Sequence, residues 1–421
     1  MVSDVSVRKY IVSTFGKTLT WSGAEAYGLF ALTNVVGLPG PTAGLLVLIF
    51  MAWAAAADLL AGALFDRYRR AGGAATPFYT VSAVLASAFF ALSFAPIPHA
   101  WPRVLLAAAA GLGFRTAYSA MDIPHNALIS QLGSASGRMR LGSLRLAATL
   151  LGGLCATTLA GWLVVAGSPG LDLNAVAYGI TIAVAAGGLF IVFVPKADAA
   201  PPAGAPEAGT GQFDLRFFLF LLGEVNVAII AGLIARNIAF LGAYVFRSPD
   251  WAAWAFLLFL TGKLAAVFVW PPLVRSRNLA AWSAAGFVLC ALTALTLACA
   301  PPQYLLMNAG LFAFGFSMGG VNQMSWTLIS TLVRKTSSRS LYFGVFSAVG
   351  KIGGGLSGFA LGLLLGDAAN GTAAVGPIYA GSMWTALACA IVGVASLGLL
   401  AILGLGREAK SVELKPLPQA T

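Results

Sequence analysis

Residues 41–70 read PTAGLLVLIFMAWAAAADLLAGALFDRYRR. Up to residue 65 this stretch holds a single ionisable side chain, Asp58, and a helix of that length crosses a hydrocarbon core of about 30 Å. Similar windows recur along a 421-residue chain that is 59% hydrophobic and 9% charged, unlike an ordinary soluble domain. The sequence therefore predicts an all-α polytopic membrane protein with twelve spans, at about 11–35, 41–65, 76–96, 102–129, 143–167, 174–195, 215–245, 251–274, 279–299, 304–332, 341–366 and 377–404.

The stretch between the sixth and seventh spans, PKADAAPPAGAPEAGTGQFD, is rich in Pro, Ala and Gly and cannot bury a core. It predicts a division into an N-terminal six-helix bundle at 1–195, a cytoplasmic linker at 196–213, a C-terminal six-helix bundle at 214–404 and a cytoplasmic tail at 405–421.

The positive charges predict the topology. Of the 25 Lys and Arg residues, eighteen fall on the side of the predicted termini, five lie within spans, and only Arg103 and Arg247 fall on the opposite side. Because cytoplasmic loops carry the positive excess, we expect both termini in the cytoplasm and the protein in the cytoplasmic (inner) membrane. The net charge of +11 then reflects contact with anionic lipid headgroups, and no nucleic-acid partner is needed.

A basic segment follows the second predicted span. Gly62 precedes the Asp66-Arg67 pair by four residues, and Arg70 follows. Glycine permits close helix approach, while the aspartate can bind a neighbouring helix end. We interpret Gly62, Asp66, Arg67 and Arg70 as a cytoplasmic gate; an ordinary positive-inside loop is the alternative.

The pattern of this segment resembles the loop signature of the major facilitator superfamily. Within it, the chain is similar to the glycoside-pentoside-hexuronide:cation symporters, whose best-known member is the melibiose permease. The matching residues are Phe15-Gly16-Lys17, Thr33 to Leu38, Trp53, Asp58 and Gly62, Tyr118 with Met121 to Pro124, Arg145, and Gly350-Lys351. The resemblance implies a major facilitator fold and secondary active transport by alternating access.

The fourth span carries a polar stripe. Arg115, Ser119, Asp122 and Asn126 are spaced by four, three and four residues, which places them on one helix face. At membrane depth such a face must contact protein or a water-filled cavity. We expect it to line a solute pathway; an Arg115–Asp122 ion pair that ties helices together is the alternative.

The resemblance also implies a solute site. It assigns Asp122, Arg145 and Lys17 to the sugar surroundings, but Thr18 replaces a second sugar-binding acid and Asn126 replaces the stacking aromatic ring. Both losses weaken a galactoside assignment, so the substrate is not expected to be melibiose.

A cation site is implied in the second span. The family pairs two acids there with an amide and a hydroxyl, whereas this chain offers Ala54, Ala57 and Asp58, with Ser119 at the hydroxyl position. A bare Na⁺ needs several oxygen ligands, and these residues supply too few. We therefore expect H⁺ to couple through Asp58, with Na⁺ disfavoured. The resemblance places Lys351 between the cation and solute sites, where pairing with Asp58 or Asp122 is expected; a purely structural Asp58–Lys351 pair is the alternative.

Several charges go beyond the family pattern, namely Glu25, Arg115, Glu224, Arg236 and Lys263. An ionisable group at membrane depth points to a functional site. With Lys17, Tyr118, Asp122, Asn126 and Arg145, we place Glu25, Arg115, Arg236, Asn322 and Trp326 in a substrate site for a charged solute, anionic if the cations face it. A Glu25–Arg115 pair between helices is the structural alternative.

The sequence thus predicts an H⁺-coupled symporter of a small polar or charged solute, glycoside-like or an organic anion, acting as a monomer in the bilayer without a cofactor or metal. A carrier of lysolipids or other amphiphiles, or an exporter, is the alternative. An enzyme is not expected, because His99 and His125 stand alone without a catalytic constellation.

Overall fold

The computed structural model describes residues 4–98, 100–128, 137–165, 171–195, 215–248, 250–274, 278–333, 339–366 and 377–403. The predicted linker, the C-terminal tail and His99 lie outside them. The described residues form twelve α-helices and no strand, which confirms the predicted fold class. Their bounds are α1 Asp4–Phe30, α2 Gly40–Arg70, α3 Ala75–Leu92, α4 Arg103–Ala127, α5 Gly137–Ala160, α6 Leu171–Phe193, α7 Leu215–Phe240, α8 Trp251–Val274, α9 Leu279–Cys299, α10 Tyr304–Val333, α11 Arg339–Leu365 and α12 Ser382–Ile402.

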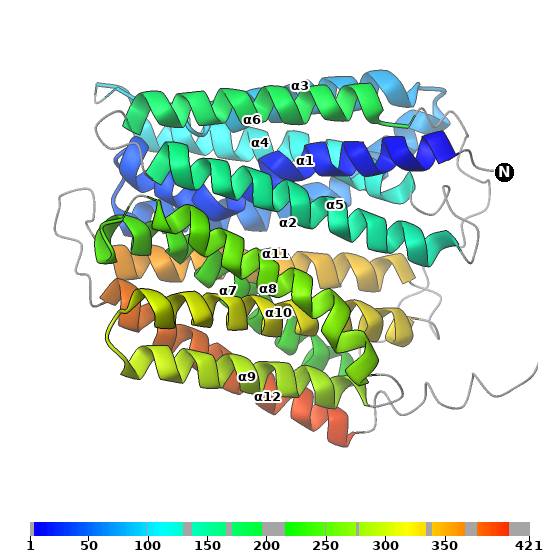
Figure 1. Ribbon diagram of the computed structural model, residues 1–421. Helices are drawn as coiled ribbons and strands as arrows, with labels where there is room; N and C mark the ends of the chain where they lie inside the picture. The colour runs from blue at the N-terminus through cyan, green and yellow to red at the C-terminus, as the bar shows by residue number, and fades with distance from the viewer. Residues whose placement is uncertain are drawn as a thin grey trace, which may run out of the picture.

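Four helices carry a five-residue π-helical segment at one end. These segments are Ala31–Val35, Gly161–Val165 and Leu241–Val245 after α1, α5 and α7, and Pro377–Gly381 before α12. Eleven of the described helices are long and apolar enough to cross a membrane. The remaining one, α1, carries Arg8, Lys9, Lys17 and Glu25, yet it lies among the others in the bundle (Figure 1).

The second helix runs further than predicted. It continues to Arg70, so the predicted gate segment forms its last turns and is not a loop. No helix breaker occurs before Gly72, whose positive φ of 85° ends the helix, and α3 begins three residues later. Arg67 is exposed there, while the side chains of Gly62, Asp66 and Arg70 lie outside the description, so the gate stays a prediction.

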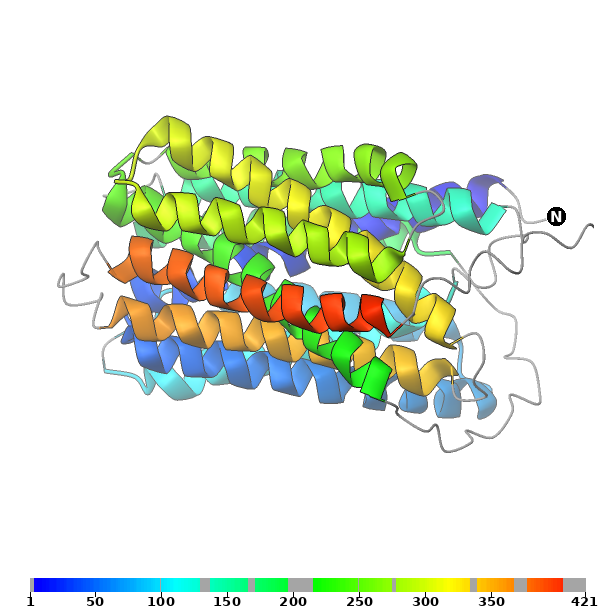
Figure 2. The same cartoon turned by 90° about the horizontal axis from the view of Figure 1, so that it is seen from below.

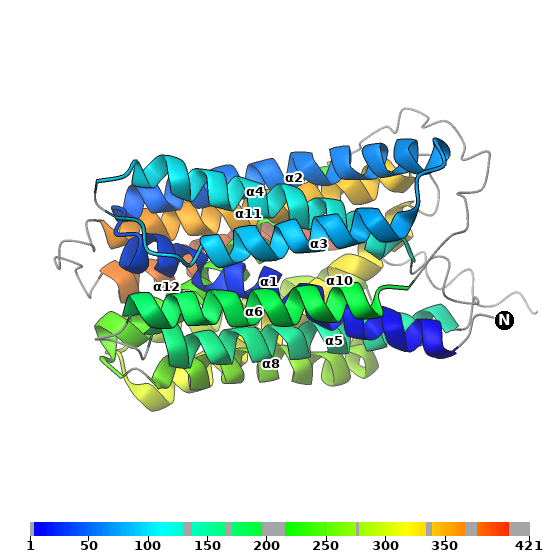
Figure 3. The same ribbon diagram turned by 90° about the horizontal axis from the view of Figure 1, so that it is seen from above.

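The helices associate in two groups of six. In the first, α1 packs on α5 and α6, and α3 lies beside α4 and α6 (Figure 3). In the second, α7 packs on α11 and α12, while α10 contacts α8 and α9. We call the groups the N half and the C half. They meet along α2 and α11, which run side by side (Figure 2), and also through α1 with α7 and α5 with α8.

The halves are in close contact at the end of the bundle where α2 begins and α11 ends, which we call the distal end. There the Gly40 N–H donates to the Gly366 carbonyl at 2.8 Å. A Cβ on Gly362 would lie 2.7 Å from the Cα of Gly44, so only glycine permits this approach. Further along, Phe30 lies 5.4 Å from Phe240 between ring centroids. The Gly40–Gly366 hydrogen bond and the Phe30–Phe240 ring contact thus join the halves toward the distal end.

Candidate functional site

Lys17 of α1 lies at the centre of a polar cluster in the N half. Its Nζ donates to Asp122 Oδ1 at 2.5 Å and to Asn126 Oδ1 at 2.8 Å, and Lys17 is only 3% exposed. Asn126 Nδ2 donates to the other Asp122 oxygen at 2.8 Å, and Arg145 Nη2 of α5 donates to Asn126 Oδ1 at 3.0 Å. These four residues form the Lys17 cluster. The aspartate, lysine and arginine expected in the solute surroundings therefore do come together.

A buried histidine, His125, lies next to this cluster in α4. His125 stacks on Tyr10 with ring centroids 4.6 Å apart, and its Nε2 lies 2.8 Å from Ser13 Oγ. The ring is fully buried and follows Pro124 within α4. Because this α4 side chain packs on Tyr10 and Ser13 of α1 and on Phe190 of α6, its geometry fits packing of these helices.

Glu25 joins the two halves. It accepts from Arg115 Nη2 of α4 at 2.6 Å and from Arg236 Nη2 of α7 at 2.5 Å. Arg236 also donates to the Gly354 carbonyl at 2.9 Å and to Ser357 Oγ at 2.5 Å, both on α11. We call this the Glu25 bridge.

The bridge corrects one sequence-based alternative. The predicted alternative of an ion pair between Arg115 and Asp122 is wrong, because each residue pairs with a side chain of α1. Arg115 pairs with Glu25, and Asp122 pairs with Lys17. The alternative Glu25–Arg115 pair is present. Its second arginine, Arg236, comes from a helix more than 200 residues away in sequence, so helix periodicity could not reveal it.

Asp58 and Lys351 form a second contact between the halves. Lys351 Nζ of α11 donates to Asp58 Oδ2 of α2 and lies 3.4 Å from the Ala54 carbonyl oxygen. Both side chains are 12% exposed. Ser119 of α4 lies beside the carboxylate, although neither its Oγ nor Asp58 Oδ1 has a partner in hydrogen-bond geometry within the described residues. The position expected for cation coupling is thus occupied by an ion pair across the interface.

Trp21, which was missed in the sequence analysis, contacts two of the three groups, which are the Lys17 cluster, the Glu25 bridge and the Asp58–Lys351 pair. The Arg115 guanidinium carbon lies 4.5 Å from the centroid of its ring, and Lys351 Nζ lies 5.5 Å away. Its other neighbour is Tyr118, at 5.0 Å between ring centroids. The available signal was spacing: Trp21 follows Lys17 by four residues and precedes Glu25 by four, so all three share one face of α1.

Two predicted site residues belong to α10. Asn322 and Trp326 of α10 are exposed, and Trp326 lies edge-on against Phe346 of α11 at 5.0 Å. Their place in the substrate site therefore stays a prediction.

The comparisons with known proteins identify the family. The profile described as "MFS/sugar transport protein" matches residues 9–404, nearly the whole chain. The chain belongs to the MFS/sugar transport protein family. It is therefore a membrane transporter of the major facilitator type, as the sequence resemblance predicted.

Individual relatives of this MFS/sugar transporter are distant. An uncharacterized symporter of Synechocystis sp. is 28% identical over 159 residues, which cover 36% of this chain and 29% of that protein. The chain thus matches less than a third of the length of this curated relative.

Solved structures show the same fold. A structure of a proton-dependent oligopeptide transporter matches with a TM-score of 0.69 and 13% identity, covering 95% of this chain and 99% of that one. A bacterial homologue of the human lysosomal transporter Spinster, in an inward-facing and occupied conformation, matches with a TM-score of 0.66 and 13% identity, covering 94% of this chain and 96% of that one. The nucleoside transporter NupG matches with a TM-score of 0.64 and 13% identity, covering 95% of this chain and 99% of that one. At this identity the likeness supports the fold alone.

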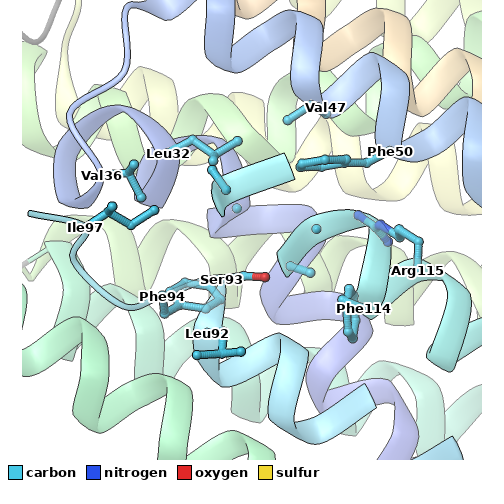
Figure 4. Close-up of a pocket in the computed structure, with 14 residues that line it drawn as sticks. Leu32, Val36, Val47, Phe50, Leu92, Ser93, Phe94, Ile97, Phe114 and Arg115 are labelled. Carbon is cyan, nitrogen blue, oxygen red and sulfur yellow. The ribbon is translucent and has the colours of Figure 1, made fainter. Parts of the chain in front are cut away.

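The MFS/sugar transporter also has an apolar pocket within its N half. Figure 4 shows its lining, in which Phe50, Phe114 and Arg115 lie toward one end and Val36 and Ile97 toward the other. Arg115 is the only charged residue among those that line it. The Nη1 of Arg115 is buried and has no hydrogen-bond partner among the described residues. The pocket therefore combines an apolar wall with an unused cationic donor.

Proposed function

We propose that the protein is a proton-coupled symporter of a small organic anion, working by alternating access in the cytoplasmic membrane. The observation that carries this proposal is an excess of positive charge in the Lys17 cluster, the Glu25 bridge and the Asp58–Lys351 pair taken together. The described members of the three groups include five cations but only three acids. The cations are Lys17, Arg115, Arg145, Arg236 and Lys351, and the acids are Glu25, Asp58 and Asp122.

Two of these cations retain unused donors. Arg115 Nη1 and Arg145 Nε are buried and lack a hydrogen-bond partner in the described part of the chain. A buried donor without a partner costs about 1–3 kcal/mol, and more when the group is charged. A carboxylate, sulfonate or phosphate on the solute would satisfy these guanidinium groups in bidentate geometry. An anionic solute therefore fits better than a neutral glycoside.

Proton coupling is favoured by the groups around Asp58. Apart from Asp58 itself, its described surroundings offer the Ser119 hydroxyl and the Ala54 carbonyl, and Lys351 already occupies the carboxylate. Na⁺ would need several oxygens and would be repelled by the ammonium group. A proton needs one carboxylate oxygen only. We therefore assign H⁺ as the coupling ion.

The Asp58–Lys351 pair suggests how proton and anion favour each other. When Asp58 accepts a proton from solvent, its charge is lost and Lys351 keeps its own proton. The ammonium group is then free to neutralise an incoming anion. Because coupling between two ligands is reciprocal, bound anion also favours protonation of Asp58. Proton and anion then reorient together, and the Asp58–Lys351 pair re-forms when both have left.

The conformer fits one stage of this cycle. If the termini are cytoplasmic, the distal end faces outward, and its tight packing closes the outer side. Breaking the Glu25 bridge and the Asp58–Lys351 pair would be required to separate the halves there. We propose that the protein acts as a monomer, with the solute and the bilayer as its partners.

Proteoliposomes that contain the purified chain and a pH-sensitive dye test this function. We expect an inward gradient of a transported organic anion to alkalinise the external medium, and a panel of hexuronates, monocarboxylates and sulfonates would identify the solute. Neutral sugars should give no proton movement. Strict Na⁺ dependence, or proton movement with neutral sugars alone, would contradict the proposal.

A second candidate is a carrier of anionic amphiphiles, favoured by the apolar pocket that Arg115 lines. An acyl chain would occupy the apolar wall while its headgroup binds the unused guanidinium donor. Uptake of a radiolabelled lysolipid that soluble anions do not compete would favour this candidate. Competition by hexuronates or short carboxylates would exclude it.

A further inference from the structure

Glu224 of α7 differs from the other acids of the membrane interior. Glu25, Asp58 and Asp122 each contact a cationic nitrogen. Glu224 is 6% exposed and forms no ion pair within the described residues. Its Oε2 is buried without a hydrogen-bond partner.

The immediate neighbours of Glu224 are neutral. The hydroxyl of Ser325 on α10 lies beside the carboxyl group, and a Cβ on Gly350 of α11 would be 3.7 Å from Oε1. One turn away on α7, Phe220 stacks on Phe346 of α11 at 5.6 Å. The carboxyl group thus lies among α7, α10 and α11, and the Ser325 hydroxyl is the polar group beside it.

Each charged group on the helices around α7 is engaged elsewhere or remote. On α1, Lys17 and Glu25 have the partners described above, while Arg8 and Lys9 lie near its beginning and Arg8 is exposed; on α11 Lys351 binds Asp58. The described side chains of α10 and α12 include no charged group. On α8, Lys263 lies over the Phe259 ring at 4.7 Å, and on α7 itself Arg236 binds Glu25 while Arg216 is exposed two turns away. No described cation therefore balances a charge on Glu224.

We propose that Glu224 is a second proton-binding site, located in the C half and occupied by a proton in this conformer. An ionised carboxylate in such surroundings would carry a desolvation cost of several kcal/mol without compensation. A neutral carboxyl group can donate to Ser325 and needs no cation. The inference deepens the proposed function, since it adds a proton to a cycle already assigned to H⁺.

The position of the site links it to the moving interface. Gly350, which lies against Glu224, directly precedes Lys351, the residue that closes the pair with Asp58. Any movement of α11 that separates Lys351 from Asp58 therefore also moves the wall of the Glu224 site. Water entering there would let the carboxyl group exchange its proton.

Infrared difference spectroscopy of the purified full chain in lipid tests the site, with protons as the only ligand. We expect a protonated-carboxyl C=O band at neutral pH that shifts in D₂O, converts reversibly to a carboxylate band as the buffer becomes alkaline, and is lost in Glu224→Gln. Ser325→Ala should shift the band without removing it. Asp58→Asn should retain it.

Two results would overturn the inference: no such band in the unaltered protein, or the same band in Glu224→Gln. If Glu224→Gln does not fold, Ser325→Ala decides, because an unmoved band would show that the carboxyl group seen is another one. The readout needs no transported solute. A missing Glu224 band therefore leaves coupling through Asp58 intact. Full concentrative uptake by Asp58→Asn with the Glu224 band present would contradict the coupling assignment and leave the Glu224 site standing.

Discussion

Lys351 of α11 and Asp58 of α2 form an ion pair that joins the C half of the bundle to the N half. The two residues are 293 positions apart in the chain. Asp58, the proposed coupling residue, is therefore part of a contact that must break when the halves separate. The same pair therefore links proton binding, anion binding and the closed state of the distal end.

Asp58→Asn should abolish uphill uptake while retaining solute exchange. Without a titratable carboxyl group, Lys351 is permanently free, so anion affinity should stay at the acidic-pH value of the unaltered protein across the whole pH range. In the unaltered protein, affinity should weaken as pH rises because the ion pair re-forms. Counterflow and equilibrium binding measured between acidic and alkaline buffer check both statements. Full concentrative uptake by Asp58→Asn would contradict the coupling assignment.

Lys351→Met should destabilise the protein, because it leaves Asp58 buried without its cation. Breaking a buried pair in this way costs about 3–5 kcal/mol, whereas removing both charges is close to neutral. We therefore expect the double variant Asp58→Asn with Lys351→Met to unfold at a higher temperature than Lys351→Met alone. Thermal unfolding in detergent provides the measurement, and an additive loss in the double variant would show that the pair contributes nothing.

Glu25→Gln should loosen the distal end. Arg115 and Arg236 would lose their shared carboxylate, and the two guanidinium groups would then repel each other across the halves. A cysteine at Ala253, which is 1% exposed and packs against Gly161, reports on this end in a background without the native cysteines. Labelling by a membrane-impermeant maleimide should become several-fold faster in Glu25→Gln. Equal labelling rates would mean that the bridge does not hold the end closed.

Gly362→Val should prevent full closure of the distal end. A Cβ at this position would lie 2.7 Å from the Cα of Gly44, and such overpacking costs about 1–3 kcal/mol. The same Ala253 cysteine should therefore be labelled faster in Gly362→Val. Gly188→Ala is the matched control, since a Cβ there would have no heavy atom within 4 Å. Equal effects of the two variants would show general destabilisation.

Trp21→Ala should weaken anion binding more than Trp21→Phe. The ring lies against both Arg115 and Lys351 and holds these cations in place by cation–π contact. Such contacts are worth about 0.5–2 kcal/mol, which corresponds to roughly a 2- to 30-fold loss of affinity. Phenylalanine keeps a π face and should retain part of the effect. Equal losses in the two variants would leave packing as the only role of Trp21.

The sequence predicted the fold well because its signals are local. Each apolar window is long enough to span the bilayer, and this property belongs to the segment alone. The polar stripe of α4 was also readable, since helix spacing places its residues on one face, and the family resemblance pointed to Lys17, Asp122 and Arg145. The end of α2 was misjudged because nothing in residues 62–70 breaks a helix, although their charge suggested a loop.

Partners across helices could not be read in this way. Arg115 lies seven residues before Asp122 on one face, but its guanidinium reaches Glu25, and Arg236 reaches the same carboxylate from the other half. Trp326 of α10 lies against Phe346 of α11, a contact that spacing within α10 does not reveal. These outcomes depend on how helices distant in sequence approach each other.

The sequence by itself determined the membrane-spanning helices, the family and the presence of charged groups within the bilayer, because chain length, hydropathy and residue spacing act within single segments. Only the tertiary structure decided which charges neutralise each other, which halves they join and which acid is left unpaired. The physical reason is that a buried charge is stabilised by whatever lies within a few ångströms of it, and those neighbours come from helices whose approach is fixed by packing along their whole length.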